Sequence, residues 1–185
     1  LEGVANDLVQ LSRRGIAEKK EAGFAHHPAE IRLRRIIGVT YNNLGYAHVT
    51  IGQFRQAVAA YANALPYLRE SRFEVQQAVT SNNLARALSE SGLPLRAARI
   101  CRDALELHER LGAESYMAYA HNTLALIFND ALTPEEAWLE AAIAAANFRR
   151  LGNARGIGLS LLQLGEALRR LSTSDKTLPD TPVEL

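Results

Sequence analysis

The sequence predicts an all-α fold, a solenoid of antiparallel helix pairs, and three observations indicate this class. A leucine returns every 40 residues, at Leu44, Leu84, Leu124 and Leu164. The residues around it return too, as YNNLGYA, SNNLARA, HNTLALI and LLQLGEA. Apolar residues within each unit recur at helical spacing. Repetition with a period of about 20 to 50 residues is typical of stacked supersecondary units, each of which completes the core of its neighbours.

The elements follow from this pattern in order along the chain. Residues 1–28 carry Val4, Leu8 and Leu11 at helical spacing, so we expect a partial or truncated helical unit there. We then expect helices at 29–51, 54–70, 73–91, 94–111, 114–131, 134–151 and 154–171. They form an array over 29–171, with units at 29–71, 72–112 and 113–152 and a capping helix at 153–171. Residues 172–185 have two prolines and no helical period, which predicts a flexible tail.

Glycine and proline define most of the helix boundaries. Gly52, Gly112 and Gly152 each follow a periodic helical segment, and glycine readily adopts the left-handed conformation that ends a helix. The third unit has Leu132 in place of this turn glycine. Pro66 should kink or end the helix that contains it.

The clearest helix start lies in the third unit, at Thr133-Pro134-Glu135-Glu136. Proline is favoured at the first helical position, and a preceding threonine can cap the helix. A glutamate in the first turn would complete a capping box with Thr133. We therefore expect the helix to begin at Pro134 with a side-chain cap.

Small residues recur where two helices must approach closely. One set follows each repeated leucine and a second lies thirteen residues after it, and the two sets are Gly45, Ala85, Ala125 and Gly165, and Ala57, Ala97 and Ala137. Without bulky side chains there, helix axes can approach to about 8–10 Å. These positions should set the geometry of each helix pair.

Composition limits the classes of function. The chain has 185 residues, 48% of them apolar, and a net charge of +1, so no strong field selects nucleic acid or a membrane surface. Its single cysteine, Cys101, excludes an internal disulfide and fits a reducing compartment. No apolar run is long enough to span a bilayer. We expect a soluble, cytoplasmic protein, and because the sequence starts at Leu1 within helical sequence, we expect it to be part of a longer chain.

The sequence carries no constellation of catalytic or cofactor-binding residues. No histidine has a partner at the spacing of a helical zinc site, and no phosphate-binding loop or nucleophile elbow is present. His48 and His121 fall on packing positions, where an interior imidazole with a hydrogen-bond partner is expected. We therefore predict a protein that is not an enzyme and has no cofactor and no metal site.

The segment NNLGYAHVTIGQFRQAVAAYANAL at 42–65 resembles a tetratricopeptide repeat. The resemblance covers about residues 29–171 and implies a right-handed superhelix whose first helices line a concave groove. The usual period of this family is about 34 residues. The longer period here is similar to the extended repeats of kinesin light chains and of sensor regions in bacterial signalling ATPases and transcription regulators.

The resemblance also implies which side chains would face a bound peptide. The candidate residues are Asn42, Tyr46, Val49, Asn82, Arg86, Glu90, Asn122, Leu126, Asn129 and Arg169. The column of three asparagines, Asn42, Asn82 and Asn122, suits an extended backbone because each amide can both donate and accept hydrogen bonds. Two alternatives remain open: the asparagines hold neighbouring helices together, or the adjacent polar column that starts at Asn43 faces the groove instead.

These observations favour a non-catalytic scaffold module that binds a protein or peptide segment. A first alternative is the sensor or regulatory arm of a larger bacterial signal-transduction ATPase or transcription regulator, which would bind other domains of its own chain. A second alternative is self-association through exposed end faces, giving a homo-oligomer.

Overall fold

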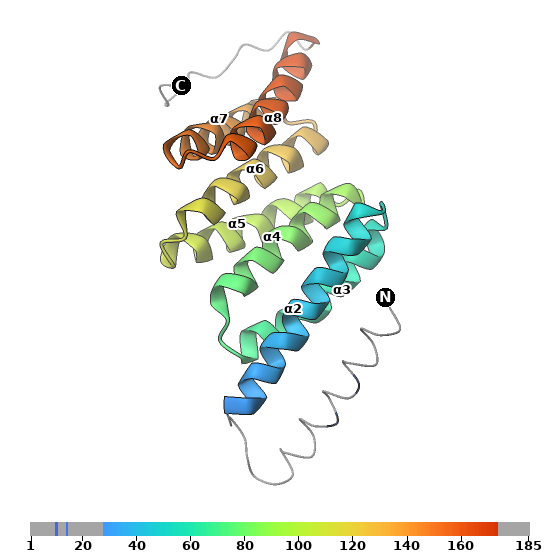
Figure 1. Ribbon diagram of the computed structural model, residues 1–185. Coiled ribbons are helices and arrows are strands. Elements are labelled where there is room, and N and C mark those ends of the chain that lie inside the picture. Colours follow the sequence, from blue (N-terminus) through green and yellow to red (C-terminus); the bar gives the residue numbers. More distant parts are fainter. Residues whose placement is uncertain (1–9, 11–13, 15–27, 174–185) are drawn as a thin grey trace. The chain divides into compact units, whose positions relative to one another are not determined.

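In the computed structural model, residues 10, 14 and 28–173 are described, and residues 28–173 contain seven helices and no strand (Figure 1). The helices are α2 (Pro28–Thr50), α3 (Phe54–Glu70), α4 (Glu74–Glu90), α5 (Pro94–Arg110), α6 (Glu114–Asp130), α7 (Pro134–Arg150) and α8 (Ala154–Thr173). The predicted all-α repeat of helix pairs is confirmed. The expected N-terminal unit before Pro28 and the expected tail after Thr173 lie outside the described residues.

The helices have regular lengths and spacing along the chain. Each of α3 to α7 has 17 residues, and from α3 to α8 each helix begins 20 residues after the one before. The expected boundaries agree with these to within a residue or two, and α3 spans the predicted residues. Pro66 does not end its helix, since α3 continues through it to Glu70.

Turns of the same kind separate the helices. Gly52, Gly92, Gly112 and Gly152 have φ between 61° and 84°, the left-handed region that glycine enters without strain. After Gly52, the N–H of Gln53 donates to the carbonyl of His48 at 2.9 Å, which closes the end of α2. Arg72 (φ 53°) and Leu132 (φ 60°) take this conformation in the other two turns, so the third unit keeps the turn without the glycine.

The expected capping box at α7 is wrong, although the helix does begin at Pro134. Thr133 makes no side-chain cap. Its hydroxyl instead donates to the carbonyl of Phe128, at 3.3 Å, at the end of the preceding helix. The N–H of Thr133 also donates to that carbonyl, at 3.0 Å, so the tight turn draws Thr133 back toward α6 and away from the start of α7.

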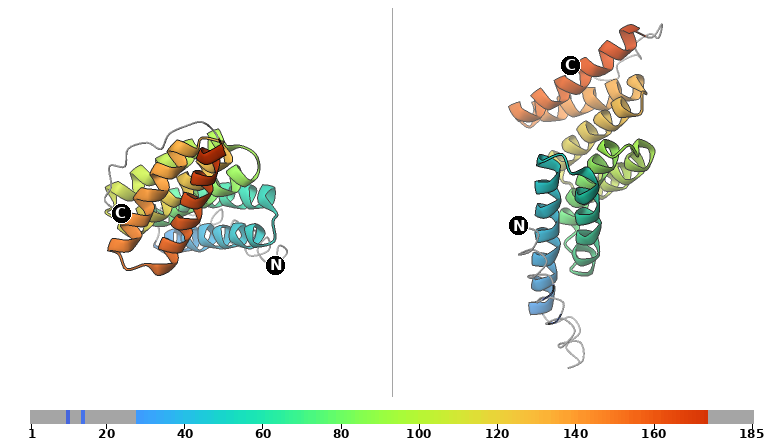
Figure 2. Two further views of the ribbon diagram at one scale, coloured as in Figure 1. Left: turned by 90° about the horizontal axis from the view of Figure 1, so that it is seen from above. Right: turned by 90° about the vertical axis from the view of Figure 1, so that its right-hand side faces the viewer.

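The chain forms two compact units, residues 1–84 and 85–185, and α4 belongs partly to each. In the first unit, α2 and α3 pack side by side around Ile37, Tyr41, Ala64 and Leu68 (Figure 2). In the second unit, α7 packs against both α6 and α8. Its core is rich in alanine, with Trp138 and Phe148 as large buried side chains. None of the helices in residues 28–173 is both long and apolar enough to cross a membrane.

Glycine lets α2 and α3 approach closely. A Cβ added at Gly38 would lie 2.7 Å from Leu68, and one at Gly45 would lie 2.6 Å from the ring of Tyr61. Both distances are shorter than van der Waals contact, so only glycine fits without movement. The prediction that Gly45 marks a close approach of two helices is confirmed.

Candidate peptide-binding surface

Asn42, the first of the predicted asparagines, lies inside the repeat packing of the first unit. Its side chain is 8% exposed. Its Oδ1 accepts hydrogen bonds from the Thr80 hydroxyl and from Nδ2 of Asn83, both at 3.2 Å. These bonds join α2 to α4, the first helices of two successive repeats. The oxygen that was expected to grip a peptide backbone is therefore already paired within the protein.

The same link occurs once more in the second unit. The Ser160 hydroxyl on α8 donates to Oδ1 of Asn122 on α6 at 3.3 Å. In both cases the hydroxyl stands 38 residues after the asparagine. The corresponding position after Asn82 is Ala120, which has no hydroxyl. Asn122 is half-buried and retains contact with solvent.

Asn129 is likewise a packing residue, since only 3% of it is exposed. Its Nδ2 donates to the backbone carbonyl of Gln163 at 3.2 Å and to the side-chain oxygen of the same residue at 3.0 Å. Nearby, the Ser89 hydroxyl donates to Asp130 at 2.6 Å. The geometry at Asn42, Asn122 and Asn129 supports the alternative that polar side chains hold successive first helices together.

Other candidate residues do reach solvent. Tyr46 on α2 is 60% exposed, and Arg86 and Glu90 on α4 are exposed as well. Val49 and Leu126 are half-buried. Tyrosine and arginine at such positions suit binding, because both combine a large contact area with hydrogen-bond donors.

Arg169 on α8 is held by an ion pair. Its Nε and Nη2 donate to the two oxygens of Glu166 at 2.9 and 2.7 Å, and Nε of Arg170 donates to the same carboxylate at 2.6 Å. These hydrogen bonds, together with the two positive charges, lower the pKa of Glu166 to about 2. Both arginines thus share one carboxylate, which leaves less of their charge for an acidic partner.

The histidines on packing positions have partners, as expected. Nδ1 of His48 lies 2.8 Å from Oε1 of Gln53. Nδ1 of His121 lies 2.7 Å from Oε2 of Glu140, which joins α6 to α7. The sequence did not indicate this second pair, because its members are 19 residues apart and share no motif.

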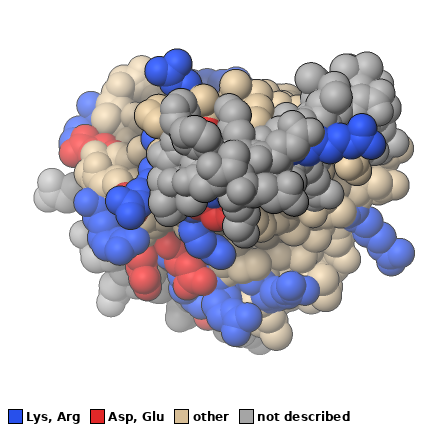
Figure 3. Space-filling model, turned by 90° about the horizontal axis from the view of Figure 1, so that it is seen from below, with Lys and Arg blue, Asp and Glu red and all other residues tan. Residues whose placement is uncertain are grey.

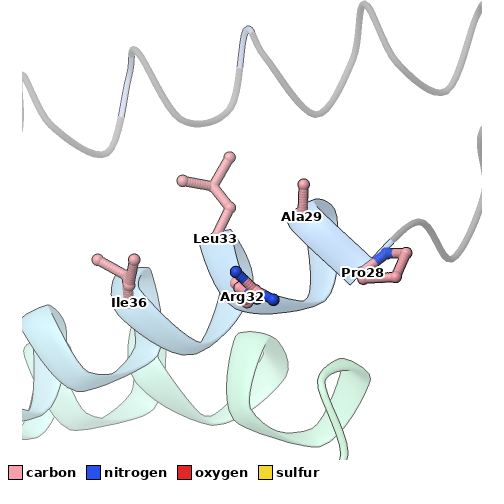
Figure 4. A pocket seen from close by; sticks show the side chains of 5 residues that line it. All are labelled: Pro28, Ala29, Arg32, Leu33 and Ile36. Atoms are coloured by element: carbon pink, nitrogen blue, oxygen red, sulfur yellow. The ribbon is translucent and has the colours of Figure 1, made fainter.

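Two further features of the described surface are a hollow and the distribution of charge. A hollow of about 340 Å³ lies along the start of α2, lined by Pro28, Ala29, Arg32, Leu33 and Ile36 (Figure 4). Among the described residues, the lining comes from α2, and all but Arg32 are apolar. On the face in Figure 3, basic and acidic side chains are interspersed, in keeping with the small net charge. No group of three or more metal-ligating side chains occurs among the described residues.

Comparison with known proteins agrees with this architecture. Residues 78–111 match the family model of the tetratricopeptide repeat. No curated protein matches the chain. Among solved structures, BtubC (BKLC) from P. vanneervenii is similar over 100% of this chain and 80% of its own, with 19% sequence identity and a TM-score of 0.53. At this identity the likeness shows the fold alone.

Proposed function

We propose that this chain, a tetratricopeptide-like repeat protein, is a non-catalytic module that binds a segment of another protein through exposed side chains of its first helices. Repeats of this family generally mediate protein–protein interaction. The observation that supports the proposal is the exposure of Tyr46, Arg86 and Glu90, which stand at positions that the resemblance to the family implies for ligand contact.

Tyr46 is the leading contact residue of the first unit. A tyrosine that is 60% exposed contributes little to the core, yet its ring offers a large area to a partner. Tyrosine and arginine are enriched among the residues that dominate binding energies at protein interfaces. Arg86 would pair with an acidic or carbonyl-rich stretch of the partner.

The asparagines have an indirect part in this proposal. Asn42 and Asn122 link first helices of successive repeats through buried or half-buried hydrogen bonds. Such links fix the spacing of the helices, so exposed side chains on them are presented in a constant register. A binding surface on rigid elements loses less entropy when a partner binds.

The non-catalytic part of the proposal is supported by the state of the single thiol. Burial raises the pKa of the Cys101 thiol far above its ordinary value. The side chain is fully buried, and its sulfur lies 3.5 Å from the carbonyl of Ala120. A buried, protonated thiol is a poor nucleophile.

Affinity capture from a lysate, with bound proteins identified by mass spectrometry, tests the proposal. We would compare wild type with Tyr46→Ala and Arg86→Ala, and use Leu95→Ala as the matched control because Leu95 is 84% exposed on a second helix, α5. A partner retained by the control and lost by the two variants supports binding by the first helices. A partner that all three variants retain, or that only Leu95→Ala loses, contradicts it.

A further inference from the structure

Helix α8 exposes a face whose counterparts in α2, α4 and α6 are covered. Gly158 and Gly165 of α8 stand 120 residues, or three repeats, after Gly38 and Gly45 of α2. In α2, these glycines lie directly under Leu68 and Tyr61 of α3. In α8, a Cβ added at either glycine would meet no described atom within 4 Å.

The neighbouring residues show the same difference. Leu161 and Leu168 of α8 are 55% and 41% exposed, whereas their counterparts in α2, Tyr41 and His48, are buried. In α4 and α6 the small residues of this face are Ala78, Ala85, Ala118 and Ala125, and all four are fully buried. Exposed leucines beside two open glycine positions form an apolar face on α8 that is suited to a partner helix.

The α2–α3 pair indicates what the occupant must supply. Tyr61 and Leu68 are seven residues apart, and they rest on Gly45 and Gly38, which are also seven apart and run in the opposite direction. The face of α8 therefore fits an antiparallel helix that presents two large side chains at this spacing.

Residues 174–185 do not carry this pattern in their sequence. Thr181 stands at the position that corresponds to Tyr61. Pro179 and Pro182 fall where a second helix would have its interior, and proline there removes a hydrogen bond and clashes with the preceding turn.

A second copy of α8 has both halves of the required pattern. Leu161 and Leu168 are seven residues apart, and so are Gly158 and Gly165. If two α8 helices run antiparallel with Leu161 of each against Gly165 of the other, Leu168 of each falls against Gly158 of the other. Both pairs are centred on residue 163, so a single twofold axis satisfies all four contacts.

We propose that the chain forms a twofold dimer in which the two α8 helices pack antiparallel, with Leu161 over Gly165 and Leu168 over Gly158 of the partner copy. Such a contact is isologous, the commonest kind in homodimers. Leu162, at 66% exposed, borders the face and extends its apolar area. The proposal stands apart from the proposed function, because it uses neither Tyr46 nor Arg86.

Sedimentation equilibrium of the 185-residue chain over a wide concentration range is the first test. We expect the mass to rise from 20.3 kDa toward twice that value. Leu161→Glu combined with Leu168→Glu should weaken the dimer by more than about tenfold, because four buried contacts would then each hold a charge. Both side chains are exposed, so the fold should persist, which circular dichroism checks. Leu95→Glu, on α5, should leave the mass unchanged.

Engineered cysteines test the register of the two helices. In the double variant Gly158→Cys with Leu168→Cys, the new thiols are opposite one another only across the twofold axis, so mild oxidation should give a covalent dimer. In the control, Gly158→Cys with Leu161→Cys, no two new thiols are opposite, and the protein should remain a single chain.

Three results would overturn the proposal. The first is a monomer at every concentration. The second is a dimer that survives Leu161→Glu with Leu168→Glu, which would place the contact elsewhere. The third is a monomer that binds a peptide of residues 54–70, the sequence of α3, because α8 would then accept a helix from a source other than a second copy.

Discussion

Asn42 joins two helices through one oxygen atom. The Thr80 hydroxyl that donates to this oxygen belongs to a fully buried residue. Loss of the hydrogen bond would therefore leave the hydroxyl without a partner and without access to solvent. Asn83 donates to the same oxygen from the next turn of α4. The free energy that Asn42 contributes is set mainly by the cost of leaving its buried hydrogen-bond partners unpaired when it is removed.

Replacing Asn42 with alanine should therefore reduce the free energy of unfolding by about 1–3 kcal/mol. The matched control is Asn43→Ala, at an exposed neighbouring position. It removes only the long hydrogen bond that Asn42 Nδ2 donates to Asn43 Oδ1 at 3.4 Å, so a change within about 0.5 kcal/mol is expected. Urea unfolding followed by circular dichroism measures both. Equal effects at the two positions would show that Asn42 does not link the helices.

His108 is a buried imidazole on α5, 1% exposed and stacked on Tyr116 with ring centres 5.3 Å apart. Burial lowers its pKa below the ordinary value of 6.5. The unfolded chain then binds a proton at a higher pH than the folded chain does. The stability that the neutral imidazole provides is thus fully present above pH 6.5 and declines as the pH falls from there toward the folded-state pKa.

We expect the wild-type protein to lose stability over the pH interval that begins at about 6.5 and extends downward. His108→Gln, which cannot titrate, should show a smaller change over the same interval. Urea unfolding of both proteins at several pH values gives the comparison. Parallel pH profiles would mean that His108 is protonated equally easily in the folded and unfolded chains.

At the scale of the helix, the same repeat position requires glycine in α2 but not in α8. A Cβ at Gly45 of α2 would collide with the buried ring of Tyr61, whereas one at Gly165 of α8 would have open space around it. The demand for glycine comes from the neighbouring helix and not from the backbone, since neither glycine has a positive φ.

Gly45→Ala should destabilise the protein by about 1–3 kcal/mol through overpacking. Gly165→Ala should stabilise it by up to about 1 kcal/mol, because alanine favours the helix over glycine. Thermal and urea unfolding at low protein concentration, where association does not contribute, measure both changes. Effects of the same sign at the two positions would contradict this account.

The helices themselves could be predicted closely from the sequence, because their signals are local. The spacing of apolar residues gives the bounds of α3, and Gly52 marks the turn before it, without reference to any other element. Prediction was weaker where a residue's conformation or hydrogen-bond partner depends on a neighbouring helix or turn. The hydroxyl of Thr133 turns to the end of α6 instead of capping α7, and Leu132 keeps the left-handed turn without being glycine.

At the scale of the whole chain, the structure divides into two compact units, and each contains a cluster of buried apolar residues. Trp138, the single tryptophan, lies in the core of the second unit with Ala141, Leu164 and Leu171. Its fluorescence therefore reports on that unit alone, whereas circular dichroism reports on all helices. In repeat proteins the effect of a substitution falls first on adjacent repeats.

Phe148 is fully buried, and its ring meets that of Tyr119 edge to face at 4.8 Å. Phe148→Ala should destabilise the second unit by about 3–5 kcal/mol. The urea midpoint measured by Trp138 fluorescence should fall further than the midpoint measured by circular dichroism, since the first unit keeps its own core. Coincident transitions in the variant would show that the chain unfolds as one cooperative body.

The candidate site was harder to predict than the fold. The sequence identified the polar columns but not the atoms with which they pair, because Asn42 and Asn43 are adjacent and chemically identical. One signal was present: hydroxyl residues stand 38 positions after Asn42 and Asn122, at Thr80 and Ser160. Among the remaining candidates, the structure distinguishes the exposed residues from the half-buried ones. Exposure depends on how neighbouring helices pack, and the sequence of a single segment does not determine that packing.

The even rhythm of α3 to α8 has a consequence for how such a chain can change in length. Because these helices start every 20 residues, Glu74 and Glu114 both stand at the start of a first helix. Excision of residues 74–113 would join Phe73 to Glu114, so the start of α6 would take the place of the start of α4. Duplication of the same stretch would insert a pair of helices in frame. Recombination between repeats can thus shorten or lengthen the array by whole pairs, so that its reach can evolve without the invention of a new core.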